Sequence, residues 1–180
     1  LSHFVYPNGF FAGSMGSRNT LHFYSHGIEL LAPTMPLAGR AAEVMLQALG
    51  EGKVVPASLQ ADRYFLYRIP EHLGVAQLPY EREDFRSVFT QGRYFIEKRD
   101  DIYLVANAAK GGVIKVFDVP SKQLILNDGG IIGKTSNGDV LTSQWINTDY
   151  DFSPTEKGFS ISGALQSVPS NKLFTPIKLI

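Results

Sequence analysis

Residues 93–146 read RYFIEKRDDIYLVANAAKGGVIKVFDVPSKQLILNDGGIIGKTSNGDVLTSQWI, and this stretch decides the fold class. Short runs rich in β-branched and aromatic residues alternate there with turn signals, including two Gly-Gly pairs and Asn137-Gly138. Turns that recur roughly every 8–12 residues are typical of an antiparallel sandwich or barrel. The predicted strands are 93–99, 102–109, 113–119, 123–127, 131–135, 140–146, 158–165 and 173–180.

Upstream of this region the pattern changes to that of helices. One continuous apolar stripe at helical spacing predicts a helix that begins near Pro36, with Thr34 as its N-cap and Gly50 and Gly52 at its end. The stripe consists of Leu37, Ala41, Val44, Met45, Ala48 and Leu49. A short or broken helix is expected between residues 20 and 32, and residues 81–89 could form another short helix.

These patterns together predict an α+β chain with two parts. Residues 1–90 form a short helical N-terminal part, and residues 91–180 form an antiparallel β-sandwich. The length of 180 residues suits one domain, or one domain with a piece of another. The chain starts at Leu1 and closes on apolar residues, so we expect it to be a piece of a longer parent chain.

Composition removes several classes of function. The formal net charge is zero, so no basic field is expected to attract nucleic acid or an anionic membrane. The chain has no cysteine, which removes disulfides, thiolate metal sites and cysteine nucleophiles. No apolar run approaches the roughly 20 residues of a membrane helix. No cofactor motif is found, and the compartment stays open, with the periplasm or the exterior of the cell as options.

The candidate functional residues cluster in GSMGSRNTLHFYSHGIE, residues 13–29. Arg18 and Asn19 could hold a carboxylate, because a guanidinium and an amide both donate hydrogen bonds to its oxygens. His22 or His26 could act as a base near neutral pH, and the Tyr24 phenol could donate a proton to a leaving oxygen. Together these groups suit proton abstraction beside a carboxylate, followed by elimination.

Two other interpretations of this cluster remain open. The same residues could be structural, with histidines satisfied by backbone carbonyls and Tyr24 packed in the core. Alternatively, His22, His26 and Glu29 have the spacing of metal ligands on a helix, although the zinc-protease pattern needs Glu where Phe23 stands.

Trp145 is a separate candidate for binding a ligand. Its ring, like that of Tyr150, could stack on a sugar, and the alternative is that it packs in the core or at a sheet edge. Asp128-Gly129-Gly130 and Asn137-Gly138-Asp139 are expected to be turns rather than calcium loops.

The order of these features resembles the junction in heparinase II/III-like polysaccharide lyases. A segment rich in glycine and aromatic residues ends in a helix and precedes VFDVPSKQLILNDGGIIGKTSNGDVLTSQW, residues 116–145. Such lyases join an α-helical toroid to an antiparallel β-sandwich and cleave uronate-containing polysaccharides by β-elimination. The resemblance implies cleft roles for Asn19, His22, Tyr24 and Arg18. The family commonly adds a histidine from the sandwich, whereas no histidine follows His72 here.

The resulting expectation is a fragment of a polysaccharide lyase-like protein whose partners are a polysaccharide and the remainder of its parent chain. Arg18, Asn19 and Trp145 are the predicted substrate-binding residues, and His22, Tyr24 and His26 the predicted catalytic ones. The fragment alone is expected to lack a complete active site. A non-enzymatic carbohydrate-binding or structural β-sandwich and a metal-dependent hydrolase are the alternatives.

Overall fold

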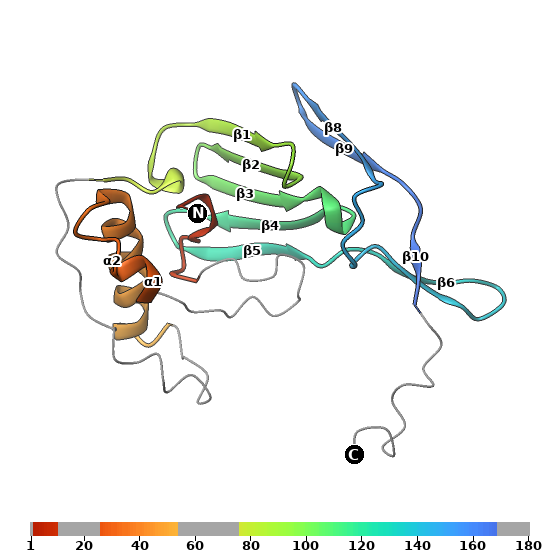
Figure 1. Ribbon diagram of the computed structural model, residues 1–180, viewed down its shortest axis with the longest axis horizontal. Coiled ribbons are helices and arrows are strands. Elements are labelled where there is room, and N and C mark those ends of the chain that lie inside the picture. Colours follow the sequence, from red (N-terminus) through yellow and green to blue (C-terminus); the bar gives the residue numbers. More distant parts are fainter. Residues whose placement is uncertain (1, 11–25, 54–75, 169–180) are drawn as a thin grey trace, which may run out of the picture.

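A five-stranded antiparallel sheet forms the body of the protein (Figure 1). The computed structural model describes residues 2–10, 26–53 and 76–168. The strands follow one another in sequence order, so each is joined to its neighbour by a short turn. They are β1 (Phe85–Phe89), β2 (Tyr94–Arg99), β3 (Ile102–Asn107), β4 (Val113–Asp118) and β5 (Gln123–Asp128).

One face of this sheet carries the core. The register pairs Ile96 with Val105 and Tyr103 with Phe117, which places these four buried side chains on the same face. They pack against helix α2 (Pro36–Gly50) and against the N-terminal segment that follows the short 3-10 helix η1 (Ser2–Phe4). The Tyr6 ring lies 4.6 Å from the ring of Phe117, centroid to centroid.

Helix α2 has the bounds that the apolar stripe indicates. Pro36 occupies its first turn, where the missing N–H costs no hydrogen bond. Beyond its end, Gly52 has a φ of +70°, and Lys53 N donates to Ala48 O, so the chain turns away through a left-handed glycine. The prediction of Thr34 as N-cap is wrong: the cap residue is Met35, and the Thr34 hydroxyl donates to Leu31 O instead.

The opposite face of the sheet is partly covered by the hairpin β8 (Asp151–Thr155) and β9 (Gly158–Ser162). Phe159 of β9 packs on Phe95 of β2 with ring centroids 4.8 Å apart. Arg86 of β1 donates to the carbonyls of Thr155 and Glu156 in the hairpin turn and pairs with Glu97 on β2. The ring contact and the Arg86 hydrogen bonds together hold the hairpin on the sheet as a sandwich-like second layer.

The remaining elements are small. A three-stranded sheet has the order β10 (Gln166–Ser167), β7 (Val140–Thr142) and β6 (Ile132–Lys134). The helical elements left are α1 (His26–Glu29) and the 3-10 helices η3 (Pro79–Glu81) and η4 (Ala108–Lys110). The predicted α+β class, a short helical part followed by antiparallel β-structure, is confirmed. Within the described ranges, no helix has the length and apolar character needed to span a bilayer.

Several segments differ from the sequence-based expectation. The strand predicted over 140–146 ends at Thr142 as β7, and β10 lies outside the predicted strands. The sequence allows a short helix over residues 81–89. The structure instead has strand β1 at Phe85–Phe89, because all five residues pair with β2. Strand β8 was not predicted, since its proline and charged neighbours are typical of a loop; Pro154 is tolerated there because the sheet has only two strands. The predicted strand 173–180 lies outside the described residues.

Candidate functional site at one end of the sheet

The acid–base cluster predicted from the sequence lies mostly outside the described residues. Arg18, Asn19, His22 and Tyr24 all fall in the range 11–25, and whether they share a cleft stays a prediction. His26 is the first residue of α1, and its side chain is also outside the described part.

The proposed metal trio has one described side chain, that of Glu29. It is 6% exposed and is the last residue of α1, so its carboxylate is largely removed from solvent. Among the residues that the structure describes, no group of three His, Cys, Asp or Glu side chains could hold a metal ion. The trio itself includes His22 and therefore stays a prediction.

Three connections meet at one end of the main sheet (Figure 1). The β1–β2 turn is joined to η4 by a hydrogen bond of 2.8 Å from Ala108 N to Arg93 O. The Arg93 guanidinium donates to the carbonyl of Tyr150, in the connection between β7 and β8. That connection also reaches η4, because Asn147 N donates to Ala109 O at 2.7 Å. We call this region the loop end of the sheet.

Trp145, the only tryptophan of the chain, projects from the loop end. Its side chain is 46% exposed, and its neighbour Ile146 is 69% exposed. Tryptophan is usually well buried, so an exposed one is more informative than an exposed surface leucine. This exposure does not fit packing of the Trp145 ring in the core, and packing at a sheet edge stays open as the alternative to ligand binding. Tyr150, by contrast, is buried at 3% exposed.

The backbone on both sides of Trp145 is anchored. Gln144 N donates to Thr142 Oγ1 at 3.0 Å, and two residues after the tryptophan Asn147 N is held by η4. The ring is thus exposed but carried by a fixed backbone. Binding to such a ring costs less ordering entropy than binding to one on an unanchored loop.

Close packing fixes the start of the same connection. Gly111 has a φ of +61°, and a Cβ placed there would lie 2.3 Å from the Cβ of Ser143. Only glycine therefore allows η4 to end where Ser143 packs against it. The Ser143 hydroxyl in turn accepts a hydrogen bond from Ile131 N at 2.9 Å, which joins the connection to the segment before β6.

Two cations belong to the same end of the sheet as Trp145. Lys110 ends η4, directly after the residue that holds Asn147, and Arg93 lies in the β1–β2 turn. Gln144 Nε2 and Tyr150 OH are buried and make no hydrogen bond within the described part of the chain. An unpaired buried polar group costs about 1–3 kcal/mol, so each of these two groups calls for a hydrogen-bond partner such as a water or a ligand.

Lys115, on the core face of β4, is the other unusual ionisable residue. The side chain is fully buried, its ammonium donates to Asn127 Oδ1 at 2.5 Å, and burial lowers its pKa. A lowered amine pKa is a common feature of reactive lysines, but a fully buried Nζ cannot be reached by a substrate. Lys115 therefore bears on stability rather than on the site.

Sequence reasoning identified Trp145 but missed its partners at the loop end. Lys110 was assigned only to a turn, and Arg93 only to a strand. The Lys110-Gly111-Gly112 turn was a usable signal, because a glycine pair allows two connections to pack closely. Comparison of the chain with models of known families, with curated proteins and with solved structures found no match. The resemblance to heparinase II/III-like lyases therefore stays a prediction.

Proposed function

We propose that this protein binds polysaccharide through the loop end of the sheet, with Trp145 as the surface on which a sugar ring stacks. The exposure of this single tryptophan on an anchored backbone is the observation that carries the proposal. An aromatic ring offers a flat apolar face to the C–H groups of a pyranose, while neighbouring polar groups bond to its hydroxyls.

The cations of the loop end supply the second part of the proposal. Lys110 lies beside the segment that carries Trp145, so its ammonium is available to pair with a uronate carboxylate. This favours the acidic polysaccharides that the resemblance implies. β-Elimination by the predicted residues Arg18, Asn19, His22 and Tyr24 would be a further property of the same protein and is not needed for binding.

Electrophoresis of the protein through gels that contain a polysaccharide tests this function. Polygalacturonate, alginate, hyaluronate and neutral xylan form a suitable panel, and migration slows when the protein binds. We expect at least one uronate polymer to retard the protein. Trp145→Ala should weaken the affinity for that polymer about tenfold, because the substitution removes the apolar ring area that the bound sugar would cover. Lys110→Met should weaken retention by uronate polymers and leave retention by xylan unchanged.

Ile125→Ala is the matched control, since it truncates an apolar side chain of similar exposure (55%) on β5. Its migration should equal that of the unsubstituted protein. Equal retention of Trp145→Ala and the control would exclude the proposed stacking role. Release of unsaturated uronate, followed by ultraviolet absorbance in the same mixtures, would separately reveal lyase activity.

A further inference from the structure

A hollow lies beside the β1–β2 turn, and none of the residues predicted from the sequence contributes to it. Its volume is about 490 Å³, within the range of small-molecule sites. The described residues that line it are Phe4, Val88, Phe89, Thr90, Gln91, Gly92 and Tyr94.

Aromatic rings form one part of this hollow and hold one another in place. Phe4 meets Tyr94 edge to face with centroids 4.9 Å apart, and the His3 ring meets Phe89 in the same way at 5.4 Å. Phe89 is nonetheless 39% exposed, so part of its surface faces the solvent. Rings fixed by neighbouring rings form a binding surface that needs little reordering when a ligand arrives.

The other part of the hollow is polar and uncharged. Thr90 supplies a hydroxyl and Gln91 a carboxamide, both exposed at the tip of the turn, and Tyr94 supplies a phenol. No charged side chain is among the described residues that line the hollow. Burial lowers the pKa of the adjacent His3, so its imidazole is also neutral at pH 7.

We propose that this hollow binds one neutral sugar ring, such as a xylose or glucose residue of a polysaccharide. Aromatic faces, hydroxyls and an amide match the C–H faces and hydroxyl groups of such a ring, whereas the uncharged lining offers no cation to offset the cost of burying a carboxylate. The inference rests on the proposed function only for the class of ligand. In this proposal the hollow at the β1–β2 turn binds the neutral sugars of a polysaccharide, and the surface around Trp145 and Lys110 binds its acidic sugars.

Amide NMR spectra of the protein titrated with xylohexaose, cellohexaose and hexagalacturonate test this assignment. We expect a neutral hexasaccharide to shift the amide signals of residues 89–92, and hexagalacturonate to leave them in place. Phe89→Ala should weaken the neutral titration about tenfold, and Gln91→Ala about threefold. Trp145→Ala should leave the shifts of residues 89–92 unchanged, because that ring is not part of the hollow.

The result separates the two proposals. Unshifted signals at residues 89–92 with all three sugars, or equal affinity of Phe89→Ala and the Ile125→Ala control, would overturn the neutral-sugar site. That outcome would leave retention of uronate polymers by Trp145 standing. Loss of Trp145-dependent retention together with normal shifts at residues 89–92 would remove the proposed function and preserve this hollow. Thermal unfolding of each variant confirms that it is folded.

Discussion

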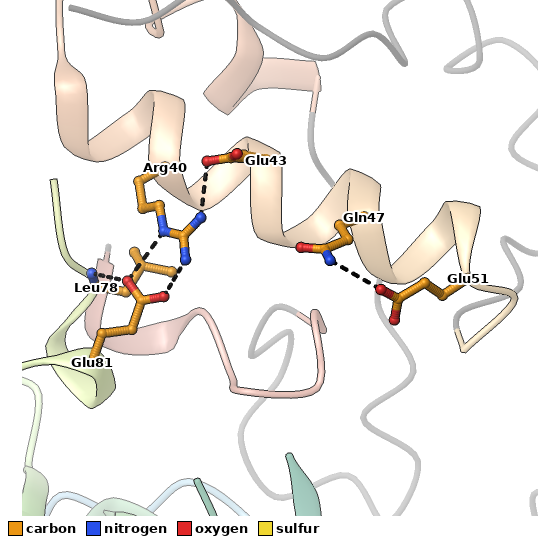
Figure 2. Close-up of polar contacts among 6 residues, drawn as sticks. All are labelled: Arg40, Glu43, Gln47, Glu51, Leu78 and Glu81. Carbon is orange, nitrogen blue, oxygen red and sulfur yellow. Dashed lines mark hydrogen bonds and ion pairs between the residues drawn. The ribbon is translucent and has the colours of Figure 1, made fainter. Parts of the chain in front are cut away.

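Arg40 and Glu81 form a two-bond ion pair that joins helix α2 to η3 across 41 residues of sequence. Arg40 Nη2 lies 2.5 Å from Glu81 Oε1, and Arg40 Nε lies 3.2 Å from Glu81 Oε2 (Figure 2). The same carboxylate accepts from Leu78 N at 2.8 Å, and Arg40 Nη1 also donates to Glu43 at 2.9 Å. The hydrogen bond to Glu81 is the main reason that the pKa of Arg40 is raised.

Substitution Glu81→Ala should lower the free energy of unfolding by about 2 kcal/mol. It removes two charge-assisted hydrogen bonds and leaves Leu78 N without its acceptor. Glu43→Ala removes the more exposed pair within α2, and loss of that pair should cost about 0.3 kcal/mol. Urea denaturation measures both. Equal losses in the two variants would show that the link between α2 and η3 does not matter for stability.

Two glycines at the end of α2 should respond to alanine in opposite directions. Gly50 is the last helical residue with open space around it, so Gly50→Ala should stabilise the protein by about 0.5–1 kcal/mol. Gly52 has a φ of +70°, so Gly52→Ala should destabilise it by about 1 kcal/mol. The midpoints of thermal unfolding should therefore move apart. A rise in both midpoints would mean that the left-handed turn after α2 is absent.

Lys115→Met should raise the free energy of unfolding at pH 7 by about 1–3 kcal/mol, because methionine fills similar volume without a buried charge. Burial lowers the pKa of Lys115 in the folded state, so the unfolded chain holds the extra proton. The contribution of Lys115 to stability should then become less unfavourable as the pH increases toward the ordinary lysine value.

The advantage of Lys115→Met should accordingly shrink between pH 7 and pH 9.5, as measured by urea denaturation. Lys134→Met, at an exposed position of β6, is the control and should change little at either pH. A difference between Lys115→Met and the unsubstituted protein that stays constant with pH would show that Lys115 titrates normally.

The sequence predicted those parts of the fold whose signals are local. The stripe from Leu37 to Leu49 predicted α2, and the turn signals Asp100-Asp101, Gly111-Gly112 and Pro120-Ser121 separated strands β2 to β5, because periodicity and turn chemistry act within a few residues. Strand β1 follows a run of charged residues, and only pairing with β2 decides its conformation.

The candidate site was harder to predict, since exposure is a property of the whole fold. Nothing in the residues next to Trp145 distinguishes a packed ring from an exposed one. The hollow at the β1–β2 turn joins Phe4 to Phe89 and Tyr94, which are more than eighty residues away. Such a contact becomes visible only after the N-terminal segment packs on the sheet.

The emission of Trp145 tests the central claim most directly, because it is the only tryptophan in the chain. Titration with the uronate polymer that best retards the protein should give a saturable blue shift, since a stacked sugar removes water from the indole. The titration should follow the same affinity as retention in the gel, and Lys110→Met should displace it to higher polymer concentration. Emission that stays unchanged while the polymer is bound would contradict the account, because the sugar would then lie elsewhere.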